Sequence, residues 1–334
     1  MGRYVARRLI QFIPVILGTL FLLHILSTLT IQIVGDPVRA LFGENAPPAA
    51  IIEQMRADYN LDDACLDQPG NPCFGLFVER LGQYGSGDFG INFRGRSVTE
   101  LFLERFPVTM RLTVIALAFE TIVGIVIGVL AGLRKDKFVD NFVRFSTVLL
   151  IAFPVFVFGT LTQLFIGLKL GLELRNSSWA PDWLGQMFNV GYNSEYPWLS
   201  LVLPGLVLGA FSLAAVARLT RTSLIENLRS DYVRTARAKG LTTRRIVGVH
   251  TLRNSLIPVV TYIGIDVGLL LGGALVTEGI FNIPGVGQLV FLAIEANDTP
   301  VILGVVTILT IVFLISNLLV DILYAALDPR IRYE

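Results

Sequence analysis

Histidine, cysteine and charged residues are scarce in this 334-residue sequence. It contains two histidines and two cysteines, and only 16% of its residues are charged. His24 and His250 fall in separate segments with no second ligand at metal-site spacing, so we assign both structural roles and predict no metal centre. The same scarcity disfavours an intramembrane protease, which needs His-Glu-x-x-His or a serine paired with a histidine.

A nucleotide-binding loop is also missing. The sequence has no Gly-Lys pair, so the pattern G-x-x-x-x-G-K-[ST], which cradles nucleotide phosphates, does not occur. We therefore predict that this chain has no catalytic residues, no cofactor and no nucleotide site of its own. Any energy source has to lie in a partner.

Apolar residues, by contrast, make up 53% of the chain, more than soluble proteins usually contain. A helix needs about 20 apolar residues to cross the roughly 30 Å of hydrocarbon in a bilayer. We predict an all-α membrane protein with six transmembrane helices. The segments that are long and apolar enough are 9–33, 107–133, 145–168, 199–217, 256–280 and 301–325.

The basic residues predict the orientation of these helices. Lysine and arginine gather on the cytoplasmic side of membrane proteins. The N-terminus, the loops 134–144 and 218–253 and the tail hold 18 of the 27 basic residues, whereas 281–300 holds none. We therefore expect both termini to be cytoplasmic.

The segment 35–106 between the first two spans is polar, with eleven acidic and six basic residues, and we predict that it is an extracytoplasmic subdomain. Cys65 and Cys73 bracket a turn-rich run within it. In an oxidising compartment a disulfide between them would contribute roughly 2.5 kcal/mol, while two unpaired thiols are the alternative. Short amphipathic helices are expected at Ile51–Tyr59 and Phe74–Leu81.

Three further regions complete the predicted organisation. Residues 1–34 form the N-terminus and first span, 107–325 form a five-helix core, and 326–334 form the tail. The core contains the long loop 218–255, which should have structure of its own, because structureless connections of that length are unusual.

Within this loop the sequence predicts two short helices joined at a glycine. Ser230 can cap a helix that begins at Asp231, and Gly240 can end it. Thr243 can cap a second helix from Arg244. One side is basic and the other carries Val233, Ala236 and Leu241, a combination that favours a groove on another protein over anionic lipid headgroups as the binding surface.

The run DYVRTARAKGLTTRRIVGVHTLRNSLIP resembles the ATPase-coupling motif of ABC-importer permeases, in the form found in the dipeptide and oligopeptide permease family. The general motif has an acid and two alanines before a glycine, then Ile-x-Leu-Pro. Here Arg234 stands in place of the acid and Arg253 in place of the proline, and both departures agree with the peptide branch. The stretches GDPVRALFG, TEGIFNIPGVGQL and LDPRIRY extend the resemblance over nearly the whole chain.

The resemblance implies a type I ABC-importer permease fold in the bacterial plasma membrane. The implied partners are a second, homologous permease, two ATPase subunits or one fused ATPase that bind ATP and Mg²⁺, an extracytoplasmic binding protein, a peptide substrate and membrane lipid; no nucleic acid is expected. A related solute such as a nickel chelate or glutathione is the alternative cargo, and an ion-coupled secondary carrier is the alternative from another class. The residues expected to couple the ATPase are Tyr232, Arg234, Ala236, Lys239, Gly240, Leu241 and Arg244.

Three acidic residues lie within the apolar spans: Glu120, Asp266 and Glu278. A carboxylate in a membrane is costly and normally faces the bundle interior or a water-filled path. One interpretation is that these residues line the translocation path and meet a peptide's amine or basic side chains. The other is a structural hydrogen bond or a contact with the sister permease.

Overall fold

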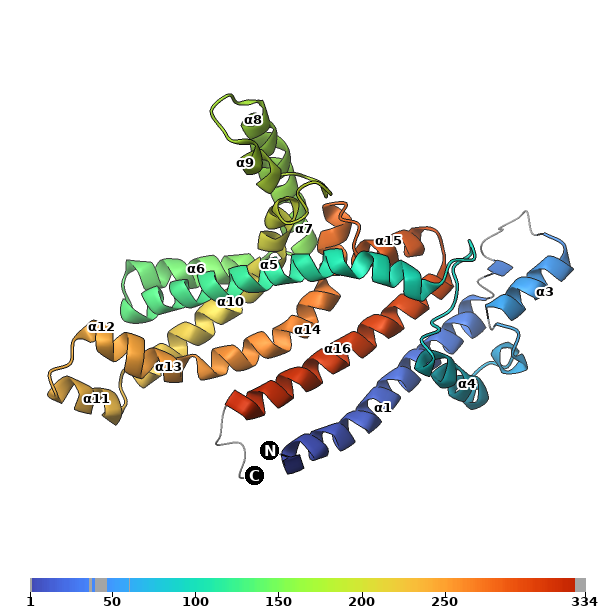
Figure 1. Cartoon of the computed structure of the whole chain (residues 1–334), viewed down its shortest axis with the longest axis horizontal. Coiled ribbons are helices and arrows are strands. Elements are labelled where there is room, and N and C mark those ends of the chain that lie inside the picture. The colour runs from blue at the N-terminus through green and yellow to red at the C-terminus, as the bar shows by residue number, and fades with distance from the viewer. Residues whose placement is uncertain (1, 36–37, 40–46, 60, 328–334) are drawn as a thin grey trace. The chain divides into compact units, whose positions relative to one another are not determined.

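A computed structural model describes the chain except for residues 1, 36–37, 40–46, 60 and 328–334. The described residues form helices and connecting loops, and their only extended pairing is an isolated bridge between Ile91 and Ser97 (Figure 1). Most of the motif GDPVRALFG, and all but the first two residues of the tail 326–334, lie outside the described residues.

Five helical segments of the described chain are long and apolar enough to cross a membrane: Ala6–Ile33, Val98–Leu133, Val155–Asn176, Leu199–Asn227 and Thr299–Val320. A sixth candidate consists of Thr243–Ser255 and Ile257–Gly272, which meet at a bend of 47°. The residues that the structure describes therefore contain five candidate spans, or six when the bent pair is counted as one.

The third span differs from the prediction, which placed one helix over 145–168. Helix α6 (Phe138–Ala152) ends within this range, at Ala152, and α7 (Val155–Thr162) begins only after Pro154. Proline disfavours the helical conformation in the residue before it, and Phe153 is extended, with φ −78° and ψ 132°. The candidate span therefore runs from Val155 through the π-helix Gln163–Leu170 to the end of α8 (Gly171–Asn176).

The chain divides into two compact units. The first combines Met1–Pro107 with Pro284–Glu334, and the second is Val108–Ile283. In the first unit α1 (Gly2–Val34) and α16 (Thr299–Leu327) lie side by side, as Figure 1 shows. Its shorter helices are α3 (Ala49–Asp58), α4 (Phe74–Gly85) and α15 (Val286–Glu295).

A disulfide-closed loop is fastened to α1 in this unit. Cys65 and Cys73 are joined by a disulfide, as the sequence predicts. Gln32 on α1 donates to the carbonyl of Asn71 at 3.1 Å and accepts from the backbone N–H of Gly70 at 3.0 Å. These hydrogen bonds and the disulfide together hold the loop in one place on the helix.

In the second unit α10 (Val202–Asn227) packs closely against α5 (Val98–Leu133), which enters from the first unit. A Cβ atom added to Gly124 would lie 2.8 Å from Val216, and one added to Gly128 would lie 2.6 Å from Ala217. Small residues let membrane helices approach this closely, and van der Waals packing is a main source of their association. Helix α10 also contacts α14 (Ile257–Ile280), so it lies against both helices that carry the predicted membrane acids.

Candidate functional site

The segment after α10 forms the helix–glycine–helix elbow that the sequence predicts. Helix α11 (Asp231–Ala238) is followed by Gly240 and then by α12 (Thr243–Arg245). Gly240 has φ +75°, a left-handed conformation that side chains disfavour, and no atom lies within 4 Å of a Cβ built there. The glycine is therefore required by the backbone turn and not by crowding.

The predicted helix caps were right only in part: Ser230 stands at the N-cap position of α11, but its side chain does not cap the helix. The hydroxyl of Ser230 donates to the carbonyl of Asn227 at 2.6 Å and makes no cap bond to α11. The residue at the cap position of α12 is Thr242 in place of Thr243, and it also makes no side-chain cap bond. The elbow is therefore held by other contacts.

Those contacts are apolar. Val233 and Ala236 on α11 form a buried cluster with Ile246, and Leu241 packs against it. Sequence reasoning assigned this apolar side to a groove on a partner, but in the structure it is the elbow's own small core. Of the residues predicted to couple the ATPase, five are exposed and therefore accessible to another protein: Tyr232, Arg234, Lys239, Gly240 and Arg244.

A hydrogen-bond network joins the elbow to α10 and to the helical turn before α14. Tyr232 donates its phenolic hydrogen to Oδ1 of Asn227 at 2.8 Å, and the Asn227 amide donates to the carbonyl of Ser223 at 2.9 Å. The hydroxyl of Ser255 on α13 (Leu252–Ser255) also reaches the Ser223 carbonyl at 3.4 Å. Sequence reasoning missed these three partners, although polar residues four apart at the end of an apolar helix are a usable signal.

A buried ion pair connects α10 with the start of α6. Nε and Nη2 of Arg221 both donate to the carboxylate of Asp140, with an Nη2–Oδ2 distance of 2.7 Å, and the backbone N–H of Asp136 adds a third bond at 2.8 Å. The Asp140 side chain is fully buried. Hydrogen bonding by the Arg221 guanidinium holds the pKa of Asp140 below its usual range. The pair therefore links two loops that the sequence marks only as basic.

The three predicted membrane acids occupy two different environments. Glu278 is fully buried and accepts a hydrogen bond from the Thr109 hydroxyl at 2.6 Å. Glu120 on α5 and Asp266 on α14 are 0% and 3% exposed and lie close enough to act on one another electrostatically. Neither oxygen of Glu120, nor Oδ2 of Asp266, has a hydrogen-bond partner in the structure.

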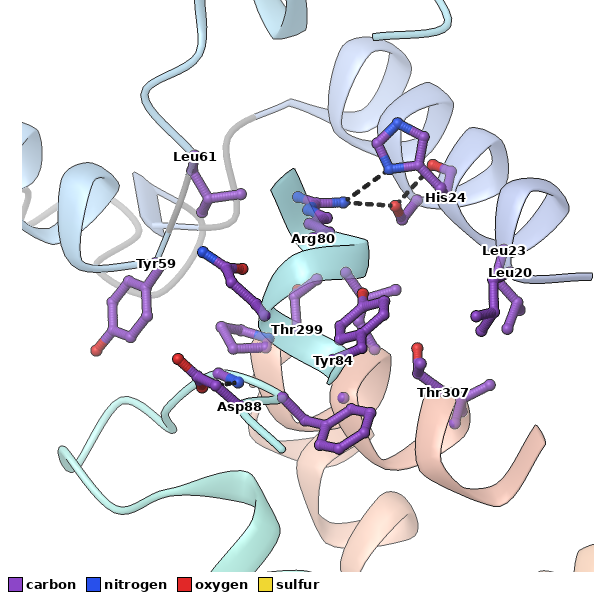
Figure 2. Close-up of a pocket in the computed structure, with 18 residues that line it drawn as sticks. Leu20, Leu23, His24, Tyr59, Leu61, Arg80, Tyr84, Asp88, Thr299 and Thr307 are labelled. Carbon is purple, nitrogen blue, oxygen red and sulfur yellow. Dashed lines mark hydrogen bonds between the residues drawn. The ribbon is translucent and has the colours of Figure 1, made fainter. Parts of the chain in front are cut away.

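Two cavities lie elsewhere. One of about 90 Å³ in the first unit is bordered by His24, Arg80 and Asp88 among others; Figure 2 shows Arg80 reaching from α4 toward His24 on α1, at 3.3 Å from Nδ1. His24 Nε2 also lies 3.1 Å from the Cys73 carbonyl, so this histidine serves as a structural link. The other cavity, about 370 Å³, is mainly apolar and lies between α6 and α7.

The fold and the elbow together define a class, the helical multi-pass membrane proteins in which a folded segment separates two spans. The family of binding-protein-dependent transport system inner membrane components matches residues 124–333, and the chain belongs to this family. It is thus the inner-membrane permease of an ABC importer, a system that also includes an ATPase and a substrate-binding protein. The family resemblance predicted from the sequence is confirmed.

Relatives match over their whole length. The chain is 36% identical to the dipeptide transport system permease protein DppB of Haemophilus influenzae over 348 residues, covering 100% of both chains. It is 36% identical to the glutathione transport system permease protein GsiC of Escherichia coli K12, and 38% identical to GsiC of Pectobacterium atrosepticum, each over 336 residues and 100% of both chains. The matched range therefore spans the elbow and the helices that carry the membrane acids.

Proposed function

We propose that this permease carries small peptides into the bacterial cytoplasm, driven by ATP hydrolysis in separate subunits that dock on the elbow. The full-length relatives are named for dipeptide and for glutathione transport, and glutathione is itself a small peptide. Dipeptides, oligopeptides and glutathione are therefore all candidate cargoes, and a nickel chelate is the related alternative.

The observation that carries the coupling proposal is the elbow's connection to the spans. Its outer face exposes Tyr232 together with basic side chains, while the hydroxyl of Tyr232 bonds to Asn227 at the end of α10. A partner that pushes on this face would displace α11, and the hydrogen bonds would pass that displacement to α10. The elbow acts in this proposal as a lever, and ATP and Mg²⁺ stay on the partner.

The same proposal sets the orientation and the assembly. The elbow and both termini face the cytoplasm, as the distribution of basic residues favours. The region 35–106 lies outside, where its disulfide is stable and a peptide-loaded binding protein can reach it. A second, homologous permease completes the membrane-embedded part.

Reconstitution in proteoliposomes tests this function. The permease, its sister permease and the ATPases are inserted, loaded binding protein is added outside, and uptake of radiolabelled Ala-Ala and glutathione is measured. We expect uptake to require internal ATP and to stop with a non-hydrolysable analogue. Uptake sustained by an ion gradient without ATP or ATPase subunits would instead identify a secondary carrier and refute the proposal.

A further inference from the structure

Two membrane helices present facing polar residues along their length. Thr109, Thr113 and Glu120 share one face of α5, since their spacings of four and seven residues fit the helical repeat. Thr109 pairs with Glu278 of α14, and Glu120 lies by Asp266 of the same helix. These two contacts are eleven residues apart on α5 and twelve on α14, about 17 Å at 1.5 Å per residue, so the helices run antiparallel in matched register.

The facing polar residues of α5 and α14 form a polar stripe. The end of this stripe at Glu120 and Asp266 lacks a positive charge. Both side chains are buried, and neither forms an ion pair within the part of the chain that the structure describes. Three of their four carboxylate oxygens have no hydrogen-bond partner. Two neighbouring carboxylates cannot both stay ionised in a low-dielectric interior unless a cation joins them. A positive group placed between the two side chains would supply donors to the carboxylate oxygens that have none.

The residues beside Glu120 and Asp266 indicate which kind of positive group could bind between them. A hydroxyl from Ser212 on α10 lies beside Glu120, and the phenol of Tyr262 lies beside Asp266. No cluster of three metal-ligating side chains occurs among the described residues, which disfavours a divalent metal. A primary ammonium fits better, because its three N–H donors can bond both carboxylates and one hydroxyl.

We propose that Glu120 and Asp266 together form a binding site for the N-terminal ammonium group of the peptide during its passage. The inference rests on the proposed peptide-import function. Every peptide with a free N-terminus carries this ammonium whatever its side chains are, so one acid pair serves cargoes of many sequences.

The rest of the stripe suits the remainder of a peptide. Thr113 and Thr277 are buried, and neither hydroxyl has a hydrogen-bond partner. Threonines in helices commonly bond the carbonyl four residues back, so two unpaired ones are unusual. They lie between the acid pair and the Thr109–Glu278 bond in sequence register, where their hydroxyls can bond a peptide backbone.

The test uses the full complex in proteoliposomes and two probes, Ala-Ala and lactoyl-alanine, in which a hydroxyl replaces the N-terminal amine. The measured quantity is the ratio of their initial uptake rates, with ATP hydrolysis stimulated by each loaded binding protein as the check on delivery. We expect Glu120→Gln and Asp266→Asn each to lower the Ala-Ala to lactoyl-alanine ratio at least tenfold. Glu173→Gln, which removes an exposed carboxylate on α8, should leave the ratio unchanged.

Other outcomes separate the two proposals. Equal loss of both probes, or an unchanged ratio in both acid variants, would overturn the ammonium site while leaving peptide import intact. Failure of the wild-type complex to take up Ala-Ala with ATP would instead refute the proposed import function. Wild-type uptake is therefore measured before any variant is tested. Because an acid variant can fail to assemble, Glu120→Asp and Asp266→Glu are also tested. Both variants keep the negative charge and should keep most of the selectivity for Ala-Ala over lactoyl-alanine. Loss of this selectivity in both variants would count against the site.

Discussion

Tyr232 on the elbow donates a hydrogen bond to Asn227 at the end of α10, with an O–O distance of 2.8 Å. The two residues are only five apart in sequence, yet they belong to different helices. This bond is a direct link between the exposed face of the elbow and a candidate membrane span, and the network continues through the carbonyl of Ser223 to Ser255. The proposed lever can therefore be tested by removing single hydrogen-bonding atoms from this network.

Removing the phenolic oxygen with Tyr232→Phe should weaken coupling and leave docking in place. The ring and its contact surface remain, but the bond to Asn227 is lost, which costs about 1 kcal/mol. We expect the amount of peptide carried per ATP hydrolysed to fall roughly fivefold while ATP hydrolysis persists. Thr235→Val is the control, because Thr235 bonds only the Asp231 carbonyl within α11; an equal loss in both variants would argue against the link.

Replacing Gly240 with leucine should uncouple ATP hydrolysis from uptake while membrane insertion stays normal. The left-handed φ of +75° costs a side chain about 1–2 kcal/mol, and the open space around Gly240 means that this strain, and not a clash, causes the effect. The elbow would relieve it by moving. Gly248→Leu, in equally open space but without a positive φ, should transport normally, and normal coupled uptake by Gly240→Leu would contradict the docking role.

The Asp140–Arg221 pair should be a strong determinant of stability. Asp140→Asn leaves Arg221 without its counter-charge and should destabilise the permease by about 3 kcal/mol. Asp136→Asn is the matched control, since Asp136 is exposed and its φ of +60° suits asparagine. Thermal unfolding in detergent measures both; equal melting temperatures for the two variants would show that the pair contributes nothing.

The same pair predicts a pH dependence. The pKa of Asp140 is lowered in the folded state, because Arg221 hydrogen-bonds the ionised form. Its contribution to stability is therefore fully present above the unfolded pKa of about 4 and is lost as the pH falls through the folded value. The melting-temperature difference between wild type and Asp140→Asn should stay constant from pH 8 to pH 5 and shrink at lower pH. A difference that grows on acidification would contradict this sign.

Local patterns in the sequence were sufficient for the elbow and for most spans. Gly240 and the helix before it depend on neighbours within ten residues, and apolar length alone locates the spans. The helix break at Pro154 also has a local cause, but the range 145–168 is long and apolar and was therefore predicted as one continuous helix. Ser230 stands at the predicted cap position, but its hydroxyl bonds backward to Asn227 and not to α11, a choice that the sequence leaves open.

Long-range pairing was the part that sequence could not supply. Asp140 and Arg221 are 81 residues apart, and each reads as an ordinary loop or helix charge until the fold joins them. Glu120 and Asp266 were recognised singly as costly membrane acids. That they meet, and that their oxygens are unpaired, follows only from the helix register.

The disulfide gives a further test, directed at the first unit. Its bond closes the loop that Gln32 fastens to α1, so its loss should free the segment between Cys65 and Cys73. In the chain-entropy model, removing it with the double change Cys65→Ser and Cys73→Ser should cost roughly 2.5 kcal/mol. We expect faster hydrogen exchange in residues 64–85 and little change in the elbow.

Reduction of the wild-type protein should reproduce this pattern, and the reductant should have no effect on the double serine variant, which is the control. Alkylation followed by mass spectrometry shows whether both thiols are released. If exchange in 64–85 were unchanged after complete reduction, the disulfide would not be needed, and the loop would be held on α1 by the hydrogen bonds of Gln32 and His24 and by the packing of Leu66 with Ile31. Gln32→Leu in the reduced protein would then loosen it, because the three hydrogen bonds of that side chain to the loop are lost at once.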